Sequence, residues 1–147
     1  MKLVLATDHA GFKLKESLKN ILINDGHKIK DFGAHQYEKL DDYPEYIVPA
    51  AKFISENRDY KGIIFGGSGQ GEAMSANRFK NVRAAVYYNG PTNIIELSRL
   101  HNNANILSLG ARFLSLNEAI TVVNLWLNIE FEGGRHESRI KKIDSLS

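Results

Sequence analysis

The sequence predicts an α/β protein in which helices cover both faces of a parallel β-sheet. Short apolar segments alternate with longer segments of helical periodicity along the 147 residues, as repeated strand–helix units require. Turn residues, mostly Gly, Asn and Asp, separate these segments. In the middle of the chain, the apolar run 61–65 leads through the glycine-rich loop Gly66-Gly67-Ser68-Gly69-Gln70-Gly71-Glu72 into a helical segment. We therefore expect right-handed strand–helix–strand connections on both sides of this loop.

The individual elements follow from periodicity and from residues that start or stop a helix. Apolar residues that recur every three or four positions predict helices, and short apolar runs bounded by turns predict strands. Pro44 suits the first turn of a helix, whereas Gly26 and Gly133-Gly134 interrupt helical segments. We expect strands over residues 2–7, 27–32, 63–65, 82–88 and 106–109. We expect helices over residues 12–22, 44–54, 73–78, 94–100, 116–127 and 135–143.

Composition limits the classes of protein that the chain can belong to. Its length, 43% hydrophobic residues and 24% charged residues suit a single globular domain over residues 1–147. A formal charge of +2 is too small to favour nucleic acid or an anionic membrane as a partner. The chain has no cysteine, so it forms no disulfide and uses no thiol chemistry. No apolar run approaches the roughly 20 residues that span a bilayer, and charge appears too early for a signal peptide. We expect a cytoplasmic protein.

The glycine-rich loop predicts an anion site beside a potential base. Its glycines allow close approach of the backbone to a ligand, and a loop that opens onto a helix N-terminus presents free N–H groups. Glu72 and Ala73 stand where a nucleotide-binding P-loop needs Lys and Ser or Thr. A dinucleotide-binding fingerprint would place its third glycine at Glu72. The loop therefore suits neither nucleotide class, and a plain tight turn is the remaining alternative.

The ends of the expected strands collect further polar residues. Ligands of parallel α/β sheets bind beyond the carboxyl ends of the strands, where the strand order reverses. Asp8 and His9 follow the first expected strand, Glu72 follows the third and Arg112 follows the fifth. His101 and the adjacent Asn102 end the helix before the fifth strand, and therefore belong to the opposite end of the sheet. A partner subunit could bring them to the site.

A set of short motifs resembles one enzyme family over nearly the whole chain. In order, these motifs are Asp8-His9-Ala10-Gly11, Asp41-Asp42-Tyr43-Pro44, Gly66-Gly67-Ser68-Gly69-Gln70-Gly71-Glu72, Ser75-Ala76-Asn77-Arg78, Arg83-Ala84-Ala85, His101-Asn102, Gly110-Ala111-Arg112 and Glu132-Gly133-Gly134-Arg135-His136-Glu137-Ser138-Arg139. Their ordered occurrence resembles the B-type ribose-5-phosphate isomerases and the related galactose-6-phosphate isomerase subunits. The resemblance implies a three-layer α/β/α Rossmann-like fold with a five-stranded parallel sheet. It also implies a homodimer or tetramer with sites shared between subunits, and no metal or other cofactor.

The resemblance also implies roles for individual residues. Glu72 would be the catalytic base, because one branch of the family uses a cysteine at the position of Gly66 and this chain has none. His101 would act as the acid that opens the sugar ring, and Ser68 could relay protons between substrate oxygens. The other implied substrate-binding residues are Asp8, His9, Gly67, Gly69, Gln70, Gly71, Asn102, Arg112, Arg135 and Arg139. The C-terminal helix would reach the partner subunit, so that some of these arginines serve the neighbouring site.

Each of these residues also has a structural alternative. Glu72 could only complement the dipole of its helix, Asp8 could cap the first helix, and His101 could favour a helix C-terminus. Arg135 and Arg139, four residues apart, could form a solvated basic face. Three functions remain open: isomerisation of ribose 5-phosphate, isomerisation of another phosphosugar such as galactose, allose or tetrulose phosphate, and non-catalytic binding of phosphate or a nucleotide.

Overall fold

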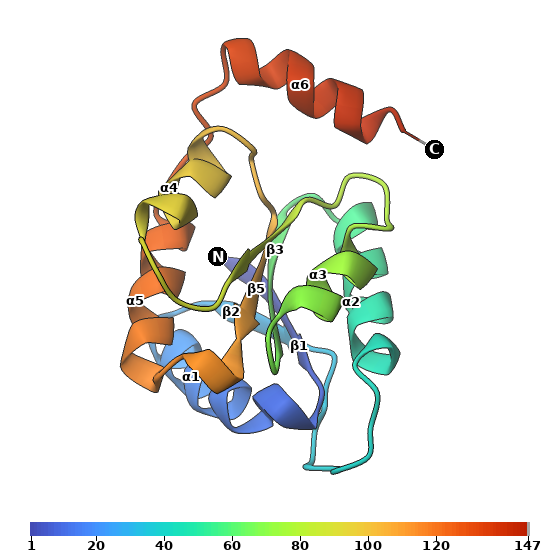
Figure 1. The fold of residues 1–147 in the computed structure, drawn as a ribbon, viewed down its shortest axis with the longest axis vertical. Helices are drawn as coiled ribbons and strands as arrows, with labels where there is room; N and C mark the ends of the chain where they lie inside the picture. The colour runs from blue at the N-terminus through green and yellow to red at the C-terminus, as the bar shows by residue number, and fades with distance from the viewer. Residues whose placement is uncertain (147) are drawn as a thin grey trace.

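A single five-stranded parallel sheet forms the centre of the computed structural model, which describes residues 1–146 (Figure 1). The strand order is β2-β1-β3-β5-β4, and every neighbouring pair is parallel. The strands are β1 (Lys2–Thr7), β2 (Lys28–Asp31), β3 (Tyr60–Gly66), β4 (Ala84–Tyr87) and β5 (Ile106–Gly110). The chain passes from β1 to β2 on one side and then to β3 on the other, so the order reverses between β1 and β3. This reversal places a ligand-binding crevice beyond the carboxyl ends of β1 and β3.

Helices cover both faces of the sheet, which confirms the predicted three-layer fold. The elements outside the sheet are η1 (His9–Gly11), α1 (Phe12–Asn24), α2 (Pro44–Glu56), α3 (Gln70–Ala76), α4 (Asn93–Leu100), η2 (Ala111–Phe113), α5 (Leu116–Leu127) and α6 (Arg135–Asp144). One core joins the sheet to α1, α4 and α5 around the fully buried Trp126. A second core joins the other face to α2 and α3 through residues such as Ile47 and Ile64. Helix α6 lies apart from both layers, over the amino ends of the strands (Figure 1).

Differences from the sequence prediction are confined to element ends. Strand β3 runs from Tyr60 to Gly66 rather than over 63–65, because Gly62 and Gly66 pair with β5 despite lacking apolar side chains. Helix α3 begins at Gln70 instead of residue 73, since Gly69 takes a positive φ of 78° and acts as its N-cap. Residues 82 and 83 of the expected fourth strand precede β4, which begins at Ala84.

A buried ion pair that the sequence prediction did not single out joins α1 to β2. The Lys15 side chain is fully buried, and its ammonium donates to both carboxylate oxygens of Asp31, at 2.8 and 2.7 Å. Lys19 and the Gly33 N–H also donate to that carboxylate. Burial alone would raise the pKa of Asp31, but the hydrogen bonds from Lys15 and Lys19 hold that pKa below its ordinary value. The ionised carboxylate therefore stabilises the fold above about pH 4, and this contribution is lost as pH falls through the lowered pKa.

Replacing Lys15 by Met should lower the free energy of unfolding by about 2–3 kcal/mol at pH 7, because Asp31 loses its buried counter-charge. Lys19 remains as a partner, so the loss should fall below that of a fully orphaned charge. Chemical denaturation checks this result, with the exposed Lys13→Met change on the same helix as the control. Equal stability of the two variants would show that the Lys15–Asp31 pair adds nothing.

Candidate active site

The glycine-rich loop connects β3 to α3 where the strands end. We call this side of the sheet its carboxyl edge, and the side where the strands begin its amino edge. Buried Ser108 of β5 donates to the Gly69 carbonyl at 2.7 Å and fixes the loop beneath its turn. The Ser68 side chain is exposed above the loop and accepts from the Gln70 N–H at 3.3 Å. Among residues 1–146, no group accepts from the N–H of Gly67, Ser68 or Gly69. The loop therefore retains backbone donors that can face a developing negative charge.

The carboxylate of Glu72 is buried against this loop and only 4% exposed. It lies directly over Gly66, where an added Cβ would overlap the carboxylate group. Burial raises the pKa of Glu72, the charge of Asp8 raises it further, and the residue's own N–H opposes both effects. Among residues 1–146, the hydrogen-bond partner of this carboxylate is the Glu72 N–H itself, and no side chain bonds to it. A buried carboxylate with no side-chain partner and with a raised pKa suits a general base better than a residue that only complements a helix dipole.

Asp8 and His9 lie in the same region, at the end of β1. Asp8 is buried and accepts from the Ala10 N–H at 2.9 Å, so it caps η1 rather than the following helix α1, whose N-cap is Gly11. The His9 ring Nδ1 lies 2.7 Å from Asp41 Oδ1, and the His9 N–H donates to the same oxygen at 2.9 Å. These two contacts orient the imidazole and leave its Nε2 for a ligand. Asp41 therefore positions His9, a role that spacing in the sequence did not predict.

Two more side chains border the loop. The Arg112 N–H donates to the Gly67 carbonyl at 3.1 Å, and its guanidinium lies so close that a Cβ on Gly67 would stand 2.9 Å from Nη1. The Tyr43 ring occupies the space beside Gly71, where any Cβ would collide with the phenol. Both contacts explain why these loop positions are glycine. Tyr43 belongs to the motif Asp41-Asp42-Tyr43-Pro44, and only the fold reveals its contact with the loop.

The remaining predicted residues lie at the opposite edge of the sheet. His101 is the C-cap of α4, five residues before β5 begins, and Asn102 follows it. Arg135 and Arg139 belong to α6, which packs near Tyr60 and Lys61 at the start of β3. Since β3 has seven residues, a strand of this length separates the two edges by about 20 Å. Within one subunit, the structure therefore does not bring this second group to Glu72.

At that opposite edge, His101 is part of a compact cluster. Its ring stacks on the ring of His136, with centroids 4.1 Å apart, and the two Nε2 atoms lie 3.6 and 3.8 Å from Glu132 Oε2. Burial lowers the pKa of His136, and the electrostatic influence of His101 and Arg135 lowers it further. No sequence spacing indicated this cluster, because His101 meets Glu132 and His136 only through the packing of α4 against the segment before α6.

Comparison with known proteins decides the family. The sequence profile of the ribose/galactose isomerase family matches residues 3–143. The chain belongs to this family. It is 36% identical over 141 residues to ribose-5-phosphate isomerase B of Mycolicibacterium paratuberculosis, covering 95% of this chain and 87% of the relative. It is 34% identical to ribose-5-phosphate isomerase B of Escherichia coli, covering 99% and 95%.

Solved structures of family members have the same fold. A ribose-5-phosphate isomerase B from Mycoplasma genitalium, with bound ribulose 5-phosphate, superposes with a TM-score of 0.92 at 36% identity, covering 97% of this chain and 93% of that one. A ribose 5-phosphate isomerase from Thermotoga maritima gives 0.91 at 40% identity, covering 99% and 98%. As a family member, the chain is an aldose–ketose isomerase. Within residues 1–146, no helix has the length and apolar character to cross a membrane.

Proposed function

We propose that this family member interconverts D-ribose 5-phosphate and D-ribulose 5-phosphate through an enediolate, with Glu72 as the base. The buried carboxylate of Glu72, which has no side-chain partner and lies beside free backbone N–H groups, is the observation that carries the proposal. The names of the similar proteins support this substrate. The proposal does not depend on a cofactor.

The chemistry assigns a task to each part of the carboxyl-edge site. Glu72 takes the proton from C2 of the open-chain aldose and returns it to C1, while the hydroxyl proton passes from O2 to O1 with help from Ser68. The free N–H groups of Gly67, Ser68 and Gly69 face the oxygen on which negative charge develops, and each such donor is typically worth about 3 kcal/mol. Asp8 and His9 bind the sugar, and Arg112 binds the phosphate. Gln70 lines the substrate side of the loop.

The amino-edge residues complete the site from a neighbouring subunit. His101 acts as the acid that opens the furanose ring, with Asn102 beside it, and Arg135 and Arg139 grip the phosphate. The charged, exposed side chains of α6 and the separation of the two edges support a shared site in a homodimer or tetramer. The positive φ angles of Gly133 and Gly134, 72° and 57°, shape the turn that carries α6 away from the sheet layers.

An isomerisation assay of the purified protein tests the substrate. The value of kcat/KM should be higher for ribose 5-phosphate than for allose 6-phosphate, galactose 6-phosphate or erythrulose 4-phosphate. The family description also covers galactose isomerases, which keeps galactose 6-phosphate as the second candidate. A higher kcat/KM with any of the other three phosphosugars would reassign the substrate and keep the isomerase chemistry.

Activity should survive exhaustive chelation, because proton transfer by Glu72 and stabilisation by N–H donors need no Lewis acid. Two groups of side chains could nevertheless hold a metal ion: His101, Glu132 and His136, and Asp8, His9 and Asp41, each with ligand atoms within 4.8 Å of one another. The measurement is kcat after dialysis against EDTA. Loss of activity that Mg²⁺, Mn²⁺ or Zn²⁺ restores would contradict the prediction and direct attention to these two groups.

A further inference from the structure

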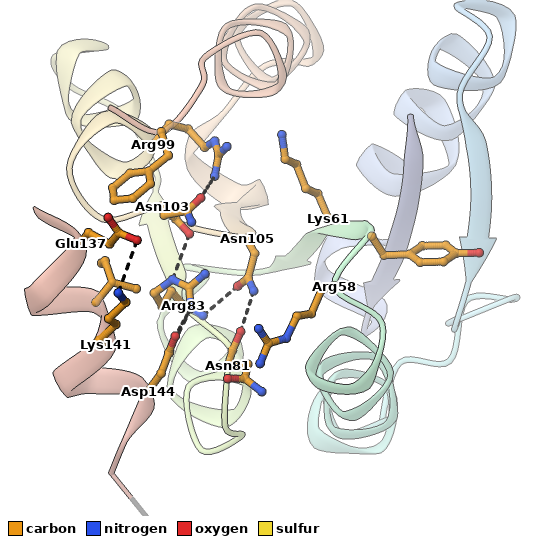
Figure 2. Close-up of a pocket in the computed structure, with 13 residues that line it drawn as sticks. Arg58, Lys61, Asn81, Arg83, Arg99, Asn103, Asn105, Glu137, Lys141 and Asp144 are labelled. Carbon is orange, nitrogen blue, oxygen red and sulfur yellow. Dashed lines mark hydrogen bonds and ion pairs between the residues drawn. The ribbon is translucent and has the colours of Figure 1, made fainter. Parts of the chain in front are cut away.

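A cavity of about 430 Å³ lies at the amino ends of β3 and β5, beneath α6 (Figure 2). Tyr60 and Lys61 of β3, the segment around Asn103 and one face of α6 form its walls. Its lining includes five basic side chains but only two carboxylates. The cavity therefore carries an excess of positive charge, in a chain whose formal charge is only +2.

Both carboxylates of the lining already have partners. Asp144 accepts from Arg83 Nη1 at 3.0 Å, and Glu137 lies 3.5 Å from the Lys141 ammonium. These pairs leave the cations of Arg58, Lys61 and Arg99. Among residues 1–146, none of these three has a carboxylate oxygen within 4.0 Å.

Arg99 is the buried member of this group, with 3% of its surface exposed. Its Nε donates to the Ile129 carbonyl, and its Nη1 donates to Asn103 Oδ1 and the Ala104 carbonyl. These acceptors are neutral, so they fix the guanidinium without cancelling its charge. No group among residues 1–146 accepts from Nη2. A buried charge of this kind is costly unless a counter-charge joins it.

Lys61 adds a second cation beside Arg99. Its ammonium lies 5.9 Å from the centre of the Trp126 ring, and the Arg99 guanidinium carbon lies 5.7 Å from the same ring. Burial lowers the pKa of Lys61, and the charge of Arg99 lowers it further, while the more distant Glu130 acts in the opposite direction. The two cations therefore repel each other in a place where an anion would relieve the repulsion.

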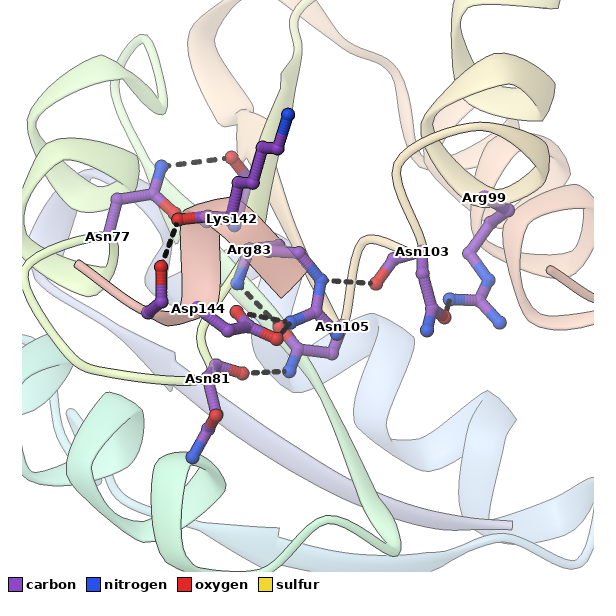
Figure 3. Close-up of polar contacts among 10 residues, drawn as sticks. Asn77, Asn81, Arg83, Arg99, Asn103, Asn105, Lys142 and Asp144 are labelled. Carbon is purple, nitrogen blue, oxygen red and sulfur yellow. Dashed lines mark hydrogen bonds and ion pairs between the residues drawn. The ribbon is translucent and has the colours of Figure 1, made fainter. Parts of the chain in front are cut away.

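A network of hydrogen bonds holds the floor of the cavity in place (Figure 3). The Arg83 N–H donates to Asn105 Oδ1 at 2.8 Å, and its Nε donates to the Asn103 carbonyl at 3.0 Å. The Asn105 amide donates to the Asn81 carbonyl at 2.7 Å. The floor is thus formed before any ligand arrives, which lowers the entropic cost of binding.

We propose that this cavity is a binding site for a small phosphate-type anion, held by Lys61 and Arg99, whose charged groups lie at the same end of the cavity (Figure 2). Guanidinium groups match the oxygens of phosphate in pairs, and an ammonium supplies a point charge beside them. The cavity volume suits a phosphate ester or pyrophosphate. This site is distinct from the phosphate grip of the proposed function. Arg112 lies at the other edge of the sheet, and Arg135 and Arg139 of α6 are not among the residues that line the cavity.

Calorimetric titration with pyrophosphate, at constant ionic strength, tests the site. Lys61→Met should weaken pyrophosphate binding by at least tenfold. Arg58→Met should leave it unchanged, because the Arg58 guanidinium lies beside Asn81, away from Lys61 and Arg99 (Figure 2). Lys52→Met removes an exposed charge from α2 and should bind as the unaltered protein does. Arg112→Ala should leave this binding event unchanged, because it alters only the carboxyl-edge site.

Three results would overturn the proposal. The first is the absence of any binding at millimolar pyrophosphate. The second is unaltered affinity in Lys61→Met. The third is loss of affinity in Arg112→Ala alone, which would place the pyrophosphate at the carboxyl edge beside Gly67.

Discussion

Glu72→Gln should lower kcat for isomerisation by about 10²-fold or more, because the amide keeps the shape of the side chain but cannot accept the C2 proton. Binding of the phosphosugar should survive, since the N–H groups of the loop and Arg112 remain. The test is kcat measured with saturating substrate, together with the affinity for a non-reactive sugar phosphate. Turnover close to that of the unaltered protein would remove Glu72 from the role of base.

Glu45→Gln is a matched control for this variant. Glu45 also lies in the first turn of its helix, α2, but it is exposed and borders no glycine loop. If Glu72 acted only through the helix dipole, both changes should have similar small effects, of about 1 kcal/mol or less. A large loss confined to Glu72→Gln would distinguish the base from a dipole partner.

The pH dependence of the unaltered protein supplies a second readout of the same assignment. The base must be ionised, so kcat/KM should rise with pH through the pKa of Glu72, which burial and Asp8 raise above its ordinary value. Asp8→Asn removes one of these causes and should move the acid limb to lower pH. The residual activity of Glu72→Gln should not show this rise of kcat/KM with pH.

The sequence predicted the fold well because its signals were local. Apolar periodicity predicted a helix over residues 116–127, and α5 has these bounds. The glycine-rich loop predicted that Glu72 follows directly after β3. Parallel topology then gathered Asp8, Glu72 and Arg112 at one edge. Topology also predicted that His101 belongs to the other edge, where it lies.

Contacts between distant segments could not be predicted from the sequence. Asp41 orients His9 across 32 positions, and Ser108 holds Gly69 across 39. Neither pair has a spacing that local periodicity reveals, because each depends on which loops meet at the sheet edge. The pairing of Lys15 with Asp31 was missed for the same reason: a lysine inside a helical stripe gives no sign that it will be fully buried.

The arrangement of the two edges leads to a prediction about assembly. Glu72 lies beside Gly66 at the end of β3, whereas Arg139 lies on α6, which packs over the beginning of that strand (Figure 1). In a symmetric dimer, α6 of one subunit can face the glycine loop of the other, and the reverse contact follows from the two-fold axis. Each complete site would then draw Glu72 from one subunit and Arg139, with Arg135 and His101, from its partner.

Mixed dimers of Glu72→Gln and Arg139→Ala proteins test this arrangement. Each variant alone should be nearly inactive at low substrate, since one loses the base and the other loses part of the phosphate grip. After random exchange, half of the dimers are mixed, and in each mixed dimer one site regains both original residues while the other loses both. Activity should therefore recover to about a quarter of the unaltered level if the two sites act independently.

The control is Glu72→Gln mixed with Asp8→Asn, two changes at one edge of the same subunit. Every site in those mixed dimers retains one altered residue, so activity should not recover beyond the sum of the two separate proteins. Mass measurement must confirm subunit exchange in both mixtures. If exchange is complete and the Glu72→Gln and Arg139→Ala mixture stays inactive, Arg139 and Glu72 do not meet across the interface, and α6 must reach the glycine loop of its own subunit.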